Sequence, residues 1–334
     1  MVRYYVGDQQ RLTFRYESGT YATASGANNW LGLVNTHTVD ENMNVKPIRY
    51  AGTNSRLVQQ FLDGAQNFTN SITYYPQNFR MLKFVLGSCV DGGSPSPYQH
   101  NYAPLHNNAS AVEVANMPLP PFTIVDEKNS GVAGSNFVRT FNGCVANTWS
   151  LSVTQGEPVT CELGYVAQSL VYSSGAVVNV SGTDTTRPYM WRDVTLRVPS
   201  GTAFNEVTNL TLSVNNNLDT PHYVDGNRTI GQPVPTNLDV ELTATINATA
   251  EVAKPLYDQY FIGGSLVNVL LGVTQSAATE ELLVTLSGCK LMDMTAPSST
   301  KGVQTFDLTF STGSVELSEF NDVQFHNFGS YAGF

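Results

Sequence analysis

Three short sequence patterns recur in the same order in the second half of the chain. The matching pairs are Thr13–Thr20 with Thr195–Thr202, the segment from Arg56 with that from Arg228, and Val138–Cys144 with Leu283–Cys289, at offsets of 182, 172 and 145 residues. The falling offsets indicate that the first copy holds extra residues before and after Arg56. An internal repeat of this size constrains the fold strongly, because both copies must form the same supersecondary units. We therefore expect two tandem domains, residues 1–185 and 186–334.

Residues of strand-like periodicity occupy equivalent places in the two copies. In the second copy the apolar residues of Leu238–Ile246 alternate with polar ones. At the same offset Phe68, Ile72 and Tyr74 alternate in the first copy, with Asn70 as a polar exception. A period of two is typical of a strand with one buried and one solvated face. The other predicted strands are Leu12–Tyr16, Leu31–Val39, Phe137–Val145, Leu163–Tyr172, Val194–Val198, Val207–Val214, Leu266–Val273, Leu282–Cys289 and Phe306–Phe310.

A short helical pattern follows the alternating strand in each copy, at Phe79–Leu86 and at Val252–Tyr260. Gly87 and Gly263 stand where a left-handed residue would end each helix. The sequence thus predicts an all-β chain with a minor helical part, built as two tandem jelly-roll β-sandwich or barrel domains with one short helix each.

Two regions fall outside the repeat. The first copy has an insertion rich in proline and glycine at about Asp91–Ser135, which we expect to be a long loop that projects and makes contacts between chains. The second copy ends in an aromatic tail that is expected either to dock between subunits or to pack on its own domain. The candidate docking residues of this tail are Phe320, Phe325, Phe328, Tyr331 and Phe334.

The charge of the chain excludes some classes of function. Charged residues make up 13% of the chain, and 17 Lys and Arg against 27 Asp and Glu give a net charge of −10. Proteins that bind nucleic acid by its phosphates need a basic footprint, so specific nucleic-acid binding is not expected. The N-terminal Met1–Gly26 lacks the apolar core of a secretory signal, which disfavours an extracellular protein.

No residue set predicts catalysis, a cofactor or a metal. No H-E-x-x-H, G-x-S-x-G, Walker A or dinucleotide-binding glycine pattern occurs. Cys89, Asp91, His100 and His106 share one region, but their spacing fits no standard zinc pattern. The remaining candidates have simpler interpretations. The acidic pair Asp239 and Glu241 is expected to lie on a solvated strand face, and Trp30, Trp149 and Trp191 are expected to be core or interface residues. The four cysteines, Cys89, Cys144, Cys161 and Cys289, are expected to be small buried apolar residues.

The two strand-rich copies, Leu12–Ser181 and Arg187–Leu317, with a helix after an alternating strand in each and the long insertion, resemble the double jelly-roll major capsid proteins of icosahedral viruses. The resemblance implies a structural virion protein without enzymatic activity, whose homotrimers have a pseudo-sixfold outline and tile a shell. It also implies other capsid proteins such as vertex proteins as partners. Because Met1–Gly26 holds only Arg3, Arg11 and Arg15 as basic residues, an internal membrane layer is the expected neighbour on the genome side.

Other classes fit the same pattern. A viral tail tube protein with a duplicated β domain has the same two strand-rich halves. An extracellular β-sandwich adhesin or carbohydrate-binding protein is disfavoured by the missing secretory signal, and an all-β enzyme by the missing catalytic residues.

Overall fold

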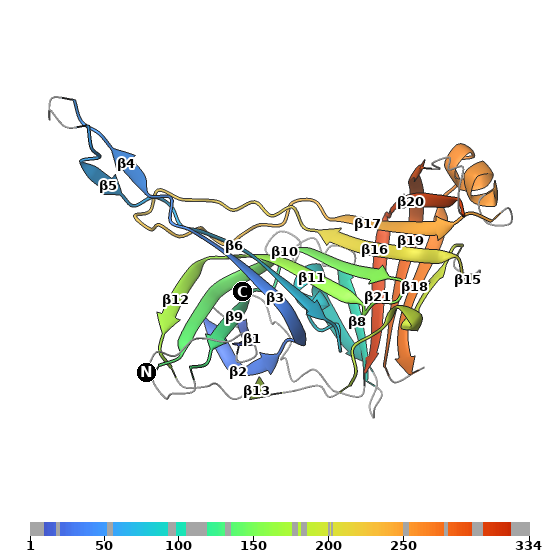
Figure 1. The fold of residues 1–334 in the computed structure, drawn as a ribbon, viewed down its shortest axis with the longest axis horizontal. Helices are drawn as coiled ribbons and strands as arrows, with labels where there is room; N and C mark the ends of the chain where they lie inside the picture. The colour runs from blue at the N-terminus through green and yellow to red at the C-terminus, as the bar shows by residue number, and fades with distance from the viewer. Residues whose placement is uncertain are drawn as a thin grey trace.

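The computed structural model shows an almost entirely β-stranded molecule from which one long hairpin projects (Figure 1). The residues that it describes are 10–17, 21–51, 56–92, 98–104, 119–130, 135–175, 180–181, 186–199, 201, 203–249, 254–276, 280–295 and 303–321. The predicted all-β class with a minor helical part is confirmed. The jelly-roll strand order stays a prediction.

The first half of the chain packs two sheets against each other. Its strands are β1 (Gln10–Glu17), β2 (Ala24–Trp30), β3 (Leu33–Asn42), β6 (Asn67–Tyr75), β9 (Phe122–Lys128), β10 (Phe137–Thr154), β11 (Thr160–Ala167) and β12 (Ser169–Ser173). One sheet has the order β2-β1-β9-β10-β12, and the other has the order β3-β6-β11-β10. The long strand β10 belongs to both sheets, so it joins them along one side.

The second half repeats this pairing scheme. Its strands are β14 (Val194–Arg197), β15 (Ala203–Phe204), β16 (Val207–Asn215), β17 (Asp239–Asn247), β18 (Val267–Ser276), β19 (Glu280–Thr295), β20 (Thr305–Ser311) and β21 (Ser314–Asn321). The orders are β15-β14-β18-β19-β21 and β16-β17-β20-β19. Each pairing in the first half therefore has a counterpart in the second.

Irregularities of the strands are repeated as well. The long strands break register at matching points, between Ala146 and Thr148 in β10 and between Leu291 and Asp293 in β19. Just before these bulges, Gly143 and Gly288 have the same left-handed φ of +64°. Glycine adopts this conformation without the steric cost of a Cβ atom. There each long strand leaves one sheet and enters the other.

The two halves are joined edge to edge. Strand β10 pairs with β16 from Thr148↔Asn215 to Thr154↔Asn209. One sheet therefore runs across the whole molecule in the order β3-β6-β11-β10-β16-β17-β20-β19, and we call it the shared sheet. Most of the buried apolar side chains of both halves belong to one contiguous cluster, which includes Trp149, Leu151 and Leu210 at this junction. The separate outer sheets lie on the core side of the shared sheet.

The insertion in the first copy is not a free loop throughout. At its start β7 (Gly87–Gly92) and β8 (Tyr98–Pro104) form a hairpin, and β9 follows in the outer sheet of the first half. Strand β8 pairs with β21, so the hairpin extends the outer sheet of the second half. The predicted loop at Asp91–Ser135 is therefore wrong for these strands. Residues 93–97, 105–118 and 131–134 lie outside the described part.

The two short helices follow β6 and β17, as predicted. α1 (Leu82–Leu86) buries most of its side chains, and Gly87 ends it with a φ of 95° and an N–H bond to Lys83. The second helix, η4 (Leu256–Ile262), has π-type hydrogen bonding. Gly263 does not have the expected left-handed φ, and the next residue, Gly264, has it instead.

A β-hairpin arm leaves the first half between β3 and β6. Its strands are β4 (Lys46–Ile48) and β5 (Gln60–Leu62). The corresponding segment of the second half, residues 216–238, runs along the base of the arm (Figure 1). There Gln66 N–H donates to the Arg228 carbonyl oxygen at 2.7 Å, and Arg228 Nε donates to the Gly64 carbonyl oxygen at 2.9 Å. Smaller elements are β13 (Val180–Ser181), parallel to β2, and η3 (Trp191–Asp193).

Candidate assembly surface

The shared sheet ends in two complementary edges. In the described part of the chain, β3 pairs with β6 alone, and Lys290–Thr295 of β19 pair with β20 alone. By the repeat, β3 corresponds to β16 and β19 corresponds to β10. The bulge between Val34 and Thr36 even matches that between Val207 and Asn209. The open edges are thus the counterparts of the two strands that join inside the chain.

The solvent-facing side of the shared sheet, here called the polar face, consists mainly of hydroxyl, amide and carboxylate side chains. Thr148, Ser213 and Thr243 are examples from its central strands. Its acidic residues are Asp40, Glu162, Asp239, Glu241, Asp293 and Asp307. Lys290, whose Nζ donates to the Gly264 carbonyl oxygen at 2.7 Å, is the basic residue on this face among the residues described.

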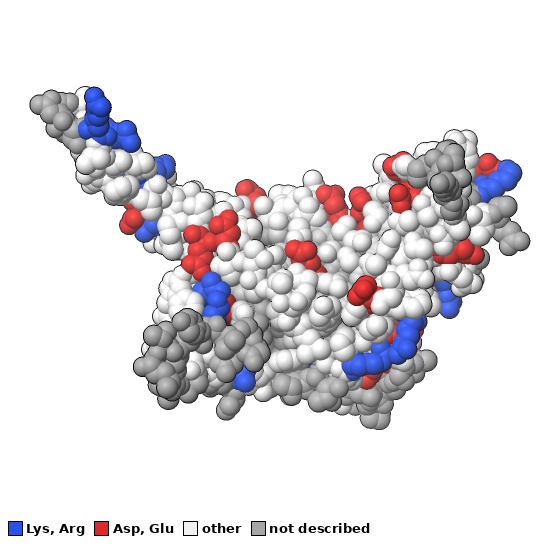
Figure 2. Space-filling model, in the orientation of Figure 1, with Lys and Arg blue, Asp and Glu red and all other residues white. Residues whose placement is uncertain are grey.

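The arm presents large apolar side chains to solvent. Tyr50, Leu57 and Phe61 are 52%, 77% and 67% exposed. Figure 2 shows the arm as a basic projection above a body with scattered acidic residues, and its cations are Lys46, Arg49 and Arg56. Exposed apolar side chains gathered on one projecting element indicate a contact surface for another protein.

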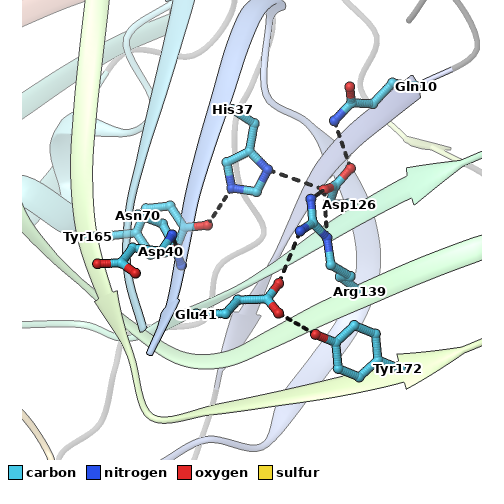
Figure 3. Close-up of polar contacts among 9 residues, drawn as sticks. All are labelled: Gln10, His37, Asp40, Glu41, Asn70, Asp126, Arg139, Tyr165 and Tyr172. Atoms are coloured by element: carbon cyan, nitrogen blue, oxygen red, sulfur yellow. Dashed lines mark hydrogen bonds and ion pairs between the residues drawn. The ribbon is translucent and has the colours of Figure 1, made fainter. Parts of the chain in front are cut away.

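A network of polar side chains crosses the interior of the first half beneath β3 (Figure 3). Asp126 of β9 is fully buried and forms an ion pair with Arg139 of β10. His37 of β3 places Nδ1 3.4 Å from Asp126 Oδ2, and its Nε2 lies 2.8 Å from the Tyr165 hydroxyl. Arg139 Nη1 donates to Glu41 Oε1 of β3 at 3.0 Å. The network thus ties the edge strand β3 to the outer sheet.

Two further side chains complete the network. Gln10 Nε2 donates to Asp126 Oδ1 at 2.8 Å, and the Tyr172 hydroxyl donates to Glu41. Burial by itself would raise the pKa of Asp126, but hydrogen bonds from His37 and Arg139, with their charges, lower it to about 2. Asp126 is therefore a carboxylate at neutral pH. Burial, and next the hydrogen bond to the Glu41 carboxylate, raise the pKa of the Tyr172 phenol to about 12.

The residues weighed as metal ligands do not form a site in the described part of the chain, where no group of His, Cys, Asp and Glu could hold a metal ion. His100 is buried opposite Glu319 in the β8–β21 pair. Glu319 accepts hydrogen bonds from the Tyr102 hydroxyl at 2.7 Å and from Phe79 N–H at 3.0 Å. This cluster anchors the inserted hairpin to the second half. His106 lies outside the described residues.

The acidic pair, the tryptophans and the cysteines named in the sequence analysis lie mostly in the core or on solvated strand faces. Asp239 and Glu241 are exposed on the polar face of β17. Trp149 is buried, and its Nε1 donates to the Tyr74 hydroxyl at 3.4 Å. Trp30 donates to Gln77 at 3.1 Å, whereas Trp191 is 40% exposed beside a cavity of about 270 Å³. All four cysteines are free thiols, and Cys144, Cys161 and Cys289 are buried as expected.

One residue of the aromatic tail, Phe320, lies in the described part of the chain. Phe320 lies within β21, between Gln99 of β8 and Glu281 of β19, so it belongs to a sheet of its own chain. Phe325, Phe328, Tyr331 and Phe334 lie outside the described residues, and their docking stays a prediction.

Sequence reasoning missed the open edges, the arm and the polar network. The network had one visible signal, the polar Asn70 on an apolar strand face. Asn70 is buried beside the network, and its Oδ1 accepts a hydrogen bond from Asp40 N–H at 3.1 Å.

Among the described helices, none has the length and apolar character needed to cross a membrane.

The model of one protein family, described as phage tail tube protein, matches residues 9–312. No curated protein matches the sequence. The family match contradicts the expected role as the major capsid protein of an icosahedral shell and agrees with the alternative of a tail tube protein. The two classes could not be separated from the sequence, because both fit two tandem strand-rich halves. What periodicity does not reveal is the edge-to-edge joining of the halves into a single sheet.

Proposed function

Because the chain belongs to the phage tail tube protein family, we propose that it is the repeating structural, non-catalytic subunit of a tail tube, and that copies join through the open edges of the shared sheet. The chain is a structural component of a phage virion. Its principal partner in the proposal is a second copy of itself.

The junction inside the chain carries this proposal. Strand β10 pairs with β16, and the open edges β19 and β3 are their repeats. A β19 strand of one copy can therefore add to β3 of the next copy as β10 adds to β16. The equivalent register places Asp293 opposite Asn42 of the neighbour, as Thr148 lies opposite Asn215. Such head-to-tail contacts close into a ring when the rotation per subunit divides a full turn.

The repeat also supports a ring size. Each chain supplies two similar β-sandwiches, so a homotrimer would have a pseudo-sixfold outline. The outer sheets lie on the core side of the shared sheet. In a closed ring we place them on the outside, where the circumference is larger. The shared sheet then forms the inner wall, with its polar face toward the lumen.

The chemistry of the polar face suits a conduit for DNA. Its carboxylates have the same sign of charge as a phosphate backbone, so they repel the polymer instead of holding it. Hydroxyl and amide groups keep the surface hydrated. A wall of this kind favours passage over binding.

The test is a pair of cysteines across the proposed seam. Cross-strand neighbours have Cβ atoms roughly 5 Å apart, within reach of a short bifunctional thiol reagent. Asn42→Cys with Asp293→Cys should give crosslinked dimers and trimers in assembled protein, with trimers as the end point of a closed ring. The pair Thr148→Cys with Asn215→Cys should crosslink within one chain and serves as the positive control.

The single variants and the unsubstituted chain, which carries its native Cys89, give the background. If Asn42→Cys with Asp293→Cys stays monomeric in protein that forms tubes, these edges do not join subunits. Crosslinked ladders that run past trimers within single rings would contradict the ring of three.

A further inference from the structure

The polar network of the first half is replaced by apolar residues in the second half. The strand registers pair the positions directly: His37 lies opposite Ile72 as Leu210 lies opposite Ala244, and Glu41 lies opposite Phe68 as Val214 lies opposite Val240. Apart from Gln10, the equivalents of the network residues and of the neighbouring Asn70 are Leu210 for His37, Val214 for Glu41, Leu242 for Asn70, Leu271 for Asp126, Val284 for Arg139, Phe310 for Tyr165 and Leu317 for Tyr172. All of these second-half residues are buried.

The fold itself therefore does not require the network. The second half builds the same sheets around an apolar interior at the same positions. Buried ion pairs lose much of their hydration, and well-packed apolar residues in their place are often as stable or more stable. A polar set confined to one of two equivalent interiors points to a role specific to that half.

That role is tied to the position of β3. Its equivalent β16 is covered inside the chain, where Trp149 lies opposite Val214 in an apolar junction. In the proposed seam between chains, Met294 takes the place of Trp149 and Glu41 takes the place of Val214. The Glu41 side chain keeps 26% of its exposure in the single chain, and that of its partner Arg139 keeps 14%. A neighbouring β19 would cover both and remove their remaining water.

Inward-pointing charged residues are one way in which proteins stop open edge strands from pairing without control. Covering a carboxylate that is already paired removes hydration without adding an attractive partner, so it opposes association. The network also holds Glu41 in this position, because Arg139 is in turn fixed by Asp126.

We infer that the network of His37, Glu41, Asp126 and Arg139 determines how readily β3 accepts β19 of a second copy, and that it keeps this edge from pairing spontaneously. The inference rests on the proposed function, since it takes the β19–β3 seam as the contact between subunits. The seam between chains is then weaker and more reversible than the apolar junction within each chain.

The test transplants the second-half residues into the first half. His37→Leu, Glu41→Val, Asp126→Leu and Arg139→Val remove the buried charges together, so none is left unpaired. In the background of Asn42→Cys with Asp293→Cys, the protein concentration that gives half-maximal crosslinking should fall at least about tenfold, which corresponds to about 1.4 kcal/mol. Glu316→Gln, on the exposed side of β21, gives the same net charge of −9 and should leave that concentration unchanged.

A second variant guards against misfolding of the fourfold one. Glu41→Gln keeps the shape of the side chain but removes its charge, and it should lower the half-crosslinking concentration by a smaller factor. Equal or higher concentrations in correctly folded variants would overturn the inference while leaving the seam itself established. No crosslinking in the unmodified background would instead remove the proposed function. Circular dichroism melts decide which variants are folded.

Discussion

Asp126 is charged inside the first half because His37, Arg139 and Gln10 surround it, and this makes stability depend on pH. Its pKa of about 2 in the folded chain lies below the usual 3.8, so the folded state gains stability above pH 3.8 and loses it as the pH falls toward 2. The linkage amounts to about 2 kcal/mol. Urea unfolding from pH 6 to pH 2 should show this loss in the natural chain. The variant Asp126→Asn should have a flatter acid limb, and parallel curves would show that the carboxylate is not coupled to folding.

Gly143 and Gly288 offer a matched comparison within one molecule. Both have φ of +64°, where a Cβ atom costs about 1–2 kcal/mol. A Cβ at Gly143 would also come within 2.9 Å of the Tyr21 ring and of Gln168, whereas one at Gly288 meets nothing within 4 Å. Gly143→Ala should therefore lower the free energy of unfolding by more than Gly288→Ala does. Equal losses in urea titrations would mean that the Tyr21 side chain moves aside without a cost in free energy.

At the scale of elements, periodicity predicted the strands whose two faces differ. Leu238–Ile246 became β17 almost unchanged, since one face is buried and the other solvated. Proline and glycine misled the interpretation of the insertion, because β8 and β9 are held by long-range partners, β21 and β1, that no local pattern reveals. The open edges could not be predicted for the same reason. Whether a strand has a neighbour depends on the order of the whole sheet.

Removal of the arm should distinguish the joining of subunits into a ring from the stacking of successive rings. Its base is fixed by Arg228 to Gly64 and Asp63, while β4 and β5 project beyond the sheets. Replacing Lys46–Leu62 with a short glycine-serine linker should leave the fold and the β19–β3 seam intact, because no strand of the shared sheet is touched. Exposed apolar residues such as Leu57 and Phe61 would be lost, so contacts between successive rings should weaken. Electron microscopy should show rings or short stacks in place of long tubes, and tubes of normal length would assign the arm another role.

For the whole molecule, the two halves of one chain are joined more extensively than two chains are in the proposed seam. The hairpin β7–β8 of the first half adds to β21 of the second, so the halves are tied at both the shared and the outer sheet. The proposed seam between chains joins only β19 and β3 among the described strands. The rigid unit is therefore the complete chain, and we expect a tube to yield between chains before it yields within them.

The orientation of the shared sheet in a tube can be read from the access of reagents to its two sides. Thr243→Cys lies on the polar face of β17, and Thr285→Cys lies on the outer side of β19 opposite Glu316. If the polar face lines the lumen, a maleimide carrying a long polyethylene glycol chain should modify Thr285→Cys in tubes and leave Thr243→Cys largely unmodified. A small maleimide, which diffuses along the lumen, should modify both. In dissociated chains the two reagents should modify both positions alike, which controls for local reactivity. Protection of Thr285→Cys with modification of Thr243→Cys by the long reagent would place the outer sheets inside, and the carboxylates of the polar face would then have no part in conducting DNA.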